Sequence, residues 1–303
     1  MKALPLGAAL SAAVLCLSVS AHGFAYCLTR TCDPETMQCE LDSTRTCIVS
    51  GKTLFWPNSC VSYDVQKDGS QKLNISYDAL HTVVVDAFQK WLDADCGNGT
   101  HPSIRVADYG AVTCAKPEYN KDQPNANIIT FHDQSPWPHP NAVDTLALTT
   151  VFFNGDSGEI YDANVEINSA EDSFAVGDAK GTQVDLNAVL THEIGHFLGL
   201  SHSAFSDATM YSSYMPGMTT LEQDDVTGIC LSLPPNRVPL GSECTPRHGF
   251  STECGQPKTG CCATAVGSTG SQSQTLGLFA FALGLTAWRG RLRLRRSARA
   301  PRR

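Results

Sequence analysis

The stretch HEIGHFLGLSH, residues His192 to His202, decides what the rest of this sequence can be. His192 and His196 are four residues apart, so on a helix they lie on one face and both imidazoles can reach the same metal ion. Gly199 lets the chain leave the helix in a sharp turn, which brings His202 round as a third ligand. Three histidines leave one coordination position open, which is typical of a catalytic zinc site.

Glu193 lies beside the first histidine, close enough to act on a water molecule bound to the metal. Zinc lowers the pKa of such a water to about 7, and Glu193 can take its proton and pass it to a leaving amine. The sequence therefore predicts hydrolysis of peptide bonds by a Glu-activated, zinc-bound water. The spacing H-E-x-x-H-x-x-G-x-x-H fixes five positions and is far more specific than H-E-x-x-H alone, which a core helix can carry.

Apolar patterns around this motif predict an α+β domain. Helices are expected from Asp185 to Leu198 and from Leu221 to Leu231. Another begins after the capping residue Ser76 and has four apolar side chains one turn apart, at Leu80, Val84, Phe88 and Trp91. Apolar runs predict strands at residues 60–65, 103–106, 128–131, 146–153 and 160–167.

The N-terminus and the cysteines indicate export. Lys2 and the apolar stretch Ala3 to Val19 precede small residues suited to cleavage near Ala21 or Ala25, which predicts a signal peptide over residues 1–25. The chain has 13 cysteines, and in an exported protein these favour disulfides. Local bridges from Cys96 to Cys114 and from Cys244 to Cys254 are plausible, although the spacing does not fix the connectivity.

Charge is distributed unevenly along the chain. Eight arginines lie within residues 289–303, and without these and Lys2 the remaining 13 basic residues face 30 acidic ones, a net charge of about −17. A body this acidic argues against nucleic acid as a partner. We expect protein or peptide substrates bound in extended form and a monomeric protein.

Four further segments follow the signal peptide. Residues 26–50 are Cys-rich and predict a disulfide-pinned extension or a short pro-segment. Residues 51–236 form the catalytic domain, and residues 237–260 predict a linker with one small disulfide loop. Residues 261–303 combine Cys261-Cys262, an apolar stretch from Thr275 to Trp288 and the arginines; the 14 residues of that stretch fall short of the roughly 20 that span a membrane as a helix.

Residues downstream of His202 resemble those of the metzincin proteases. Met210, in Ala208-Thr209-Met210-Tyr211, lies eight residues after His202 and is similar to the Met-turn beneath the zinc site of that group. Among the metzincins, the chain resembles the matrixins most in three features: Ser203, Tyr214 and the segment LEQDDVTGI (residues 221–229). The resemblance places Tyr214 in the wall of the substrate pocket.

The same resemblance implies the zincin fold for residues 54–235. That fold has a five-stranded twisted mixed sheet with one antiparallel edge strand, three main helices and a Met-turn. The edge strand corresponds to Thr145–Phe153 and would hold an extended peptide by strand addition.

Several features depart from the matrixin pattern. The strands at Leu146–Thr149 and Tyr161–Asn164 lack the histidines that bind a structural zinc in animal matrixins. Ser212 replaces the usual proline after Met-Tyr, and no cysteine switch precedes the domain, which argues against latency by that mechanism.

Two other groups of side chains are candidate metal ligands. His132, Asp133 and His139 could bind a metal in their loop, although solvated loop residues are the simpler interpretation. Three carboxylates are candidate calcium ligands: Asp156, Asp162 and Glu166.

The C-terminal segment resembles the MYXO-CTERM sorting signals of myxobacteria. This implies a bacterial protein displayed at the cell surface, with membrane association only through the tail. Two hypotheses compete with the endopeptidase: a surface binding or adhesion module on a zincin scaffold, and a zinc hydrolase of non-peptide amides. Glu193 favours catalysis, because a scaffold that only binds zinc needs no general base.

Overall fold

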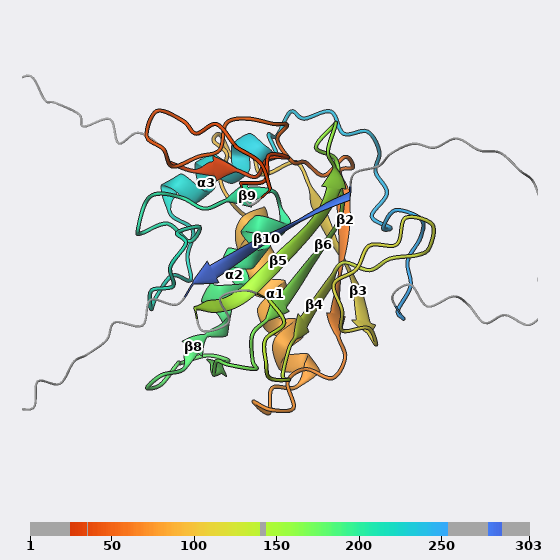
Figure 1. Ribbon diagram of the computed structural model, residues 1–303, viewed down its shortest axis with the longest axis vertical. Coiled ribbons are helices and arrows are strands. Elements are labelled where there is room, and N and C mark those ends of the chain that lie inside the picture. The colour runs from red at the N-terminus through yellow and green to blue at the C-terminus, as the bar shows by residue number, and fades with distance from the viewer. Residues whose placement is uncertain (1–24, 35, 140–143, 254–277, 287–303) are drawn as a thin grey trace, which may run out of the picture.

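Six strands form one mixed sheet in the computed structural model, which describes residues 25–34, 36–139, 144–253 and 278–286 (Figure 1). Their order across the sheet is β10-β5-β6-β4-β2-β3. Strand β5 runs antiparallel to both of its neighbours, and the other pairs are parallel. The strands are β2 (Cys60–Gln66), β3 (Arg105–Val112), β4 (Ile128–Phe131), β5 (Thr145–Asn154), β6 (Ile160–Ile167) and β10 (Leu278–Thr286).

The five predicted strands are therefore present and form the predicted mixed sheet, but two details differ. Strand β3 starts two residues later than predicted and runs on to Val112. Strand β5 is not at the edge, because β10 pairs with it from Leu278 to Thr286. Strand β10 comes from the apolar stretch 275–288, in which Phe279 and Phe281 are residues that favour strands.

Three helices confirm the predicted positions to within two residues: α1 (Tyr77–Leu92), α2 (Leu186–Phe197) and α3 (Gln223–Ser232). The Ser76 hydroxyl accepts the Ala79 N–H at 3.2 Å and caps α1. The Asp185 carboxylate accepts the Asn187 N–H at 2.8 Å and caps α2. Each side chain satisfies a backbone donor that has no partner within its helix.

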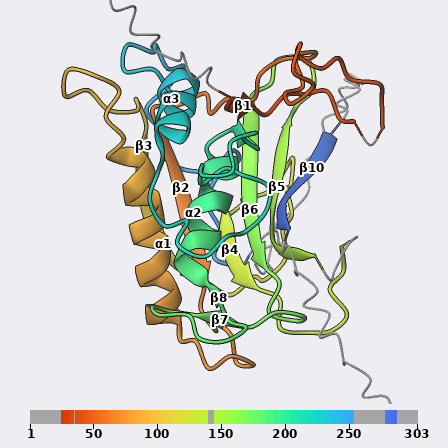
Figure 2. The ribbon, with the colours of Figure 1, turned by 90° about the vertical axis from the view of Figure 1, so that its left-hand side faces the viewer.

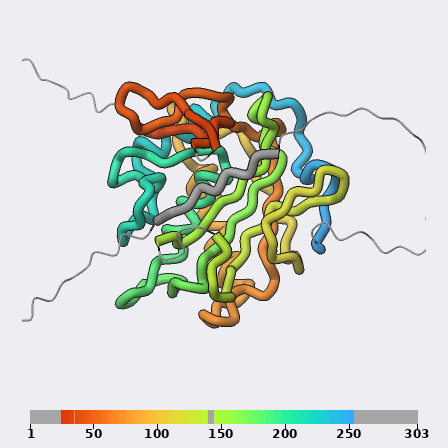
Figure 3. Tube along the Cα trace, viewed as in Figure 1, coloured from red at the N-terminus to blue at the C-terminus, as the bar shows by residue number. Residues whose placement is uncertain are grey.

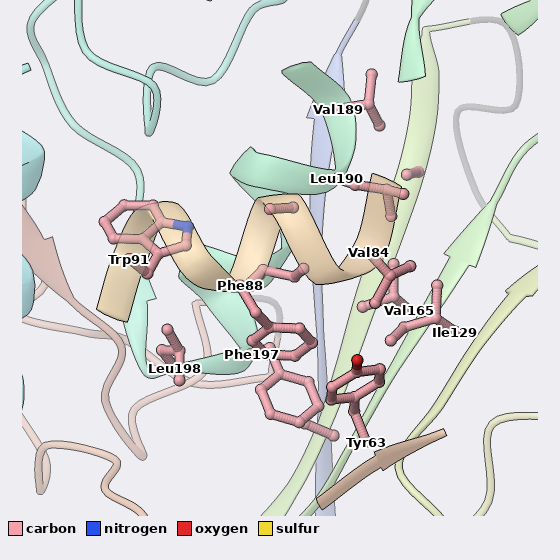
Figure 4. Close-up of a cluster of buried hydrophobic side chains, with 14 of the residues drawn as sticks. Tyr63, Val84, Phe88, Trp91, Ile129, Val165, Val189, Leu190, Phe197 and Leu198 are labelled. Carbon is pink, nitrogen blue, oxygen red and sulfur yellow. The ribbon is translucent and has the colours of Figure 1, made fainter. Parts of the chain in front are cut away.

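Helices α1 and α2 cover the same face of the sheet, and the core lies between (Figure 2). The aromatic rings of Phe88 on α1 and Phe197 on α2 meet edge to face at 5.3 Å (Figure 4). The indole of Trp91 donates to the Thr191 carbonyl at 2.8 Å, so it also fixes α1 against α2. Helix α2, which carries buried polar side chains, is thus held against α1 by an aromatic contact and a hydrogen bond.

The Cys-rich N-terminal segment packs beside the chain that follows α2 (Figure 3). Its strand β1 (Cys27–Leu28) pairs with β9 (Leu200–Ser201). Another short pair, β7 (Phe174–Ala175) with β8 (Val184–Asp185), precedes α2. Disulfides Cys27–Cys47 and Cys32–Cys39 pin the N-terminal segment internally.

Both local disulfides expected from the sequence are wrong. Cys96, after α1, pairs with Cys230 in α3, and Cys60 in β2 pairs with Cys244. Cys114 is disulfide-bonded as well, and Cys254 lies outside the described residues. The observed bridges join elements that are 134 and 184 residues apart in sequence, so spacing along the chain gave no indication of them.

The described part of the predicted linker, residues 237–253, lies against the domain. The Arg237 guanidinium donates to the carbonyls of Trp56, Asn58 and Ser103. Arg247 contacts Glu159 at 3.0 Å. The predicted signal peptide and most of the C-terminal segment lie outside the described residues, and no helix within the described ranges is long and apolar enough to cross a membrane.

The sheet face opposite α1 and α2 buries polar side chains. Asp64 on β2 and Asp162 on β6 are both fully buried. Burial raises the pKa of Asp64 to about 8, although the nearby backbone of Asn127 acts to lower it. Burial raises the pKa of Asp162 well above its usual range, against a hydrogen bond from Asn164. Asp64 is therefore held in the neutral, protonated form near neutral pH, and burial favours the neutral form of Asp162.

We expect Asp64→Asn to weaken the pH dependence of stability. The unfolded chain loses the Asp64 proton near pKa 3.8, whereas the folded protein keeps it until about pH 8. The wild-type free energy of unfolding should therefore fall as pH rises through this window, while asparagine has no proton to lose. Urea unfolding at about pH 5 and about pH 7.5 measures the difference, with exposed Asp122→Asn as the control. If the free energy of unfolding fell by the same amount between the two pH values in the wild type and both variants, that result would contradict a protonated Asp64.

Candidate metal centre

Helix α2 and the turn after it supply all four residues of the predicted site. His192, Glu193 and His196 lie on α2 and are at most 1% exposed. Gly199 has φ +101°, a left-handed conformation that a side chain disfavours, and its N–H donates to the His196 carbonyl at 2.9 Å. The chain then passes through β9 and returns His202 to the helix, as the motif predicted.

The three imidazoles converge. One ring nitrogen from each of His192, His196 and His202 lies within 4.8 Å of the others. The two Nε2 atoms of His196 and His202 are 3.3 Å apart. Within the described ranges, this is the one group of three or more His, Cys, Asp or Glu side chains that can share a metal ion.

Hydrogen bonds orient the rings toward a common point. Nδ1 of His192 lies 2.6 Å from the Thr209 carbonyl, and Nδ1 of His196 lies 2.9 Å from the Leu200 carbonyl. A carbonyl only accepts, so both Nδ1 atoms donate and both Nε2 atoms keep a lone pair. Nε2 of His192 is buried without a hydrogen-bond partner among the residues described. A metal ion at the centre would satisfy that atom.

Burial also keeps the three rings neutral. It lowers the pKa of His192 to about 3 and that of His202 to about 4, and it lowers the pKa of His196 well below its usual range. Neutral imidazoles bind metal without first releasing a proton. Three nitrogen donors with a coordination position left open fit zinc, so the residues present match the ion that the motif predicted.

The Met-turn lies directly under this centre. Met210 is 2% exposed, and its carbonyl accepts the Ser203 N–H at 2.8 Å. A Cβ on Gly195 of α2 would lie 2.2 Å from the Met210 sulfur and 2.8 Å from the Trp91 ring. Glycine at this position therefore allows the turn to approach the helix between the two histidines.

Asp225 on α3 holds the Met-turn in place. Its two carboxylate oxygens accept the N–H groups of Thr209 at 2.8 Å and of Met210 at 3.0 Å. The Thr209 carbonyl in turn orients His192. Burial raises the pKa of Asp225 to about 6 against these hydrogen bonds. The sequence identified Asp225 only through the matrixin-like segment 221–229, because no spacing rule links a carboxylate to a turn 15 residues away.

Two more side chains contact α2 or its N-terminal cap. The Tyr214 hydroxyl accepts the Asp185 N–H at 3.2 Å beside the start of α2, and its role in a substrate pocket stays a prediction. The Thr149 hydroxyl on β5 lies 2.6 Å from Oε2 of Glu193. The sequence analysis did not identify Thr149. The only feature that could have pointed to it is a hydroxyl side chain in a largely apolar strand.

The alternative metal ligands do not converge. Asp133 accepts hydrogen bonds from the hydroxyls of Ser70 and Ser169, whereas His139 contacts Glu166 at 2.7 Å. Asp162 and Glu166 are four residues apart on β6, which separates them by about 13 Å. One calcium ion therefore cannot bind both of these carboxylates.

Known proteins are similar in sequence to part of this chain. Residues 118–231 match the family model of the matrixins. Metalloendoproteinase 1-MMP of Arabidopsis thaliana is 40% identical over 104 residues, which are 33% of this chain and 26% of that protein. Metalloendoproteinase 2-MMP of the same plant is 33% identical over 157 residues, 50% of this chain and 39% of that protein.

A bacterial protein is similar as well. Karilysin of Tannerella forsythia is 29% identical over 111 residues, 37% of this chain and 23% of that protein. The chain thus spans well under two thirds of the length of these curated relatives. The family match begins before β4, ends within α3 and includes the whole histidine centre. Over residues 118–231 this chain is therefore similar to the matrixin metalloproteases.

Proposed function

We propose that this chain is a secreted zinc endopeptidase. The observation that carries the proposal is the convergence of three neutral histidines, two buried and one half-buried, beside a fully buried glutamate. The disulfides and the matrixin match support secretion. Glu193 distinguishes this function from that of a binding module, because zinc binding alone gives no reason to bury a fourth, non-ligating ionisable group.

Each residue has a role that follows from its position. Nε2 of His192 and of His196, with the ring of His202, would hold the zinc, which when bound supplies Lewis-acid polarisation of a peptide carbonyl and of water. Glu193 removes a proton from the attacking water and delivers it to the amide nitrogen as the C–N bond breaks. The water oxygen stays on the carbonyl carbon, so the products are a carboxylic acid and an amine. By its resemblance to the matrixins, Tyr214 would form part of the wall of the pocket for the side chain after the cleaved bond.

The substrate would bind as an extended strand along β5. Thr149 in this strand touches Glu193, so a peptide backbone paired with β5 passes next to the general base. In the structure Leu283 of β10 faces Thr149 in the β-ladder, on the side of β5 away from β6. A peptide substrate and β10 therefore compete for one row of backbone donors and acceptors.

The C-terminal segment is proposed to direct display at the cell surface. Cys261-Cys262, the apolar stretch and the terminal arginines support this role through their resemblance to bacterial sorting signals.

We expect deletion of residues 261–303 to move a tagged protein from the cell envelope to the medium. Fractionation of cells expressing the full-length and the shortened chains, followed by immunoblotting, measures the shift. Equal release of the two proteins would contradict surface display.

Glu193→Ala tests catalysis against binding. We expect at least a thousandfold loss of peptidase activity with one zinc still bound per chain, because the three ligands remain while the proton acceptor is gone. A quenched fluorescent peptide library and metal analysis by mass spectrometry give the two readouts. A wild-type protein that holds zinc but cleaves no peptide in the library would contradict the enzymatic function and leave the binding module.

Breaking the β10 ladder should raise activity toward peptides. Adjacent residues of a strand point their N–H groups in opposite directions, so Ala282→Pro with Leu283→Pro removes at least one donor to β5. We expect kcat/KM to rise several-fold, mainly through a lower KM, because the substrate no longer displaces β10. Ser268→Pro with Thr269→Pro, outside β10, is the matched control. Unchanged kcat/KM in the β10 variant would contradict shared use of β5.

A further inference from the structure

Thr149 interrupts an apolar row on β5. The residues that alternate with it toward α2 are Ala147 and Val151, and both belong to the main core. Thr149 itself is 0% exposed. Burying a hydroxyl is unfavourable unless it forms a hydrogen bond, and valine has nearly the same shape without that cost. Core packing alone therefore does not account for threonine at this position.

The Thr149 hydroxyl is directed at the proposed general base. Its Oγ1 lies 2.6 Å from Oε2 of Glu193 and 3.1 Å from the Glu193 backbone carbonyl. A hydroxyl has a single hydrogen to donate. The carboxylate is the closer of the two acceptors, and a bond to an ionised oxygen is about twice as strong as one between neutral groups.

The contact joins two rigid elements. Thr149 lies in the middle of β5, which is paired along both sides, and Glu193 lies in the middle of α2. Threonine is restricted at χ1, so its hydroxyl is held in one direction. Glutamate has three rotatable side-chain bonds, and such a contact holds its carboxylate in one orientation.

We propose that Thr149 is a positioning residue for Glu193. It fixes Oε2, and so aims Oε1 at the position where a water attacks the peptide carbonyl. The Thr149 side chain touches neither substrate nor metal and acts only through the glutamate. The proposal rests on the endopeptidase function and adds a residue outside the zinc-binding motif to its machinery.

The test compares Thr149→Val, Thr149→Ser and the wild type as full-length, zinc-loaded proteins. Loss of an oriented charge-assisted hydrogen bond should lower kcat of the valine variant about tenfold to a hundredfold, with KM within about twofold. The serine variant keeps the hydroxyl and should retain most of kcat. Thr150→Val, on the opposite face of the same strand, is the matched control and should leave kcat unchanged.

Two readouts besides activity separate positioning from a structural role. Zinc content and the thermal unfolding midpoint of Thr149→Val should match the wild type, and a crystal structure should show the Glu193 carboxylate turned away from its wild-type orientation. If the valine variant fails to fold, Thr149→Ala against Thr149→Ser isolates the hydroxyl.

Full kcat in the valine variant, or an equal loss in valine and serine variants, would overturn the proposal. An inactive wild type would instead refute the endopeptidase function, and an unmoved Glu193 in the crystal structure of Thr149→Val would then refute positioning independently.

Discussion

The structure depends on two backbone carbonyls that each hold the Nδ1 hydrogen of a buried histidine. The Thr209 carbonyl orients His192, and the Leu200 carbonyl orients His196. Without these acceptors the rings could rotate or exchange tautomers, and the two Nε2 lone pairs would no longer point at one centre. Contacts from several other parts of the fold hold these two carbonyls in position.

Each carbonyl is fixed by a different part of the chain. The Asp225 carboxylate on α3 accepts the N–H groups of Thr209 and Met210, which lie on either side of the Thr209 carbonyl. Gly195 lets the turn that contains this carbonyl approach α2. The Leu200 carbonyl also accepts the Thr29 hydroxyl at 2.8 Å, from the Cys-rich N-terminal segment. The disulfide-pinned extension thus takes part in the centre, and residues from position 29 to position 225 act on the same two rings. From the other side, β5 supplies Thr149 to the glutamate between those histidines.

The sequence predicted the local parts of this arrangement and missed the contacts between distant parts. Helical spacing of His192 and His196, the glycine at 199 and the capping residue Ser76 depend on a few neighbouring residues, so pattern alone located them. Disulfides Cys60–Cys244 and Cys96–Cys230 depend on the tertiary fold, and expectations based on short spacing were wrong. Strand β10 and the Thr149–Glu193 contact were missed for the same reason, since only the assembled sheet brings them to the site.

The most direct test of the account is anomalous diffraction at the zinc edge from crystals of the zinc-loaded, full-length protein. We expect one peak about 2.0–2.1 Å from a ring nitrogen of each of His192, His196 and His202. We also expect a fourth coordination position without a protein ligand, and Glu193 within hydrogen-bond reach of that position. A peak elsewhere, or Glu193 bound to the metal as a fourth protein ligand, would contradict a catalytic zinc centre served by a general base.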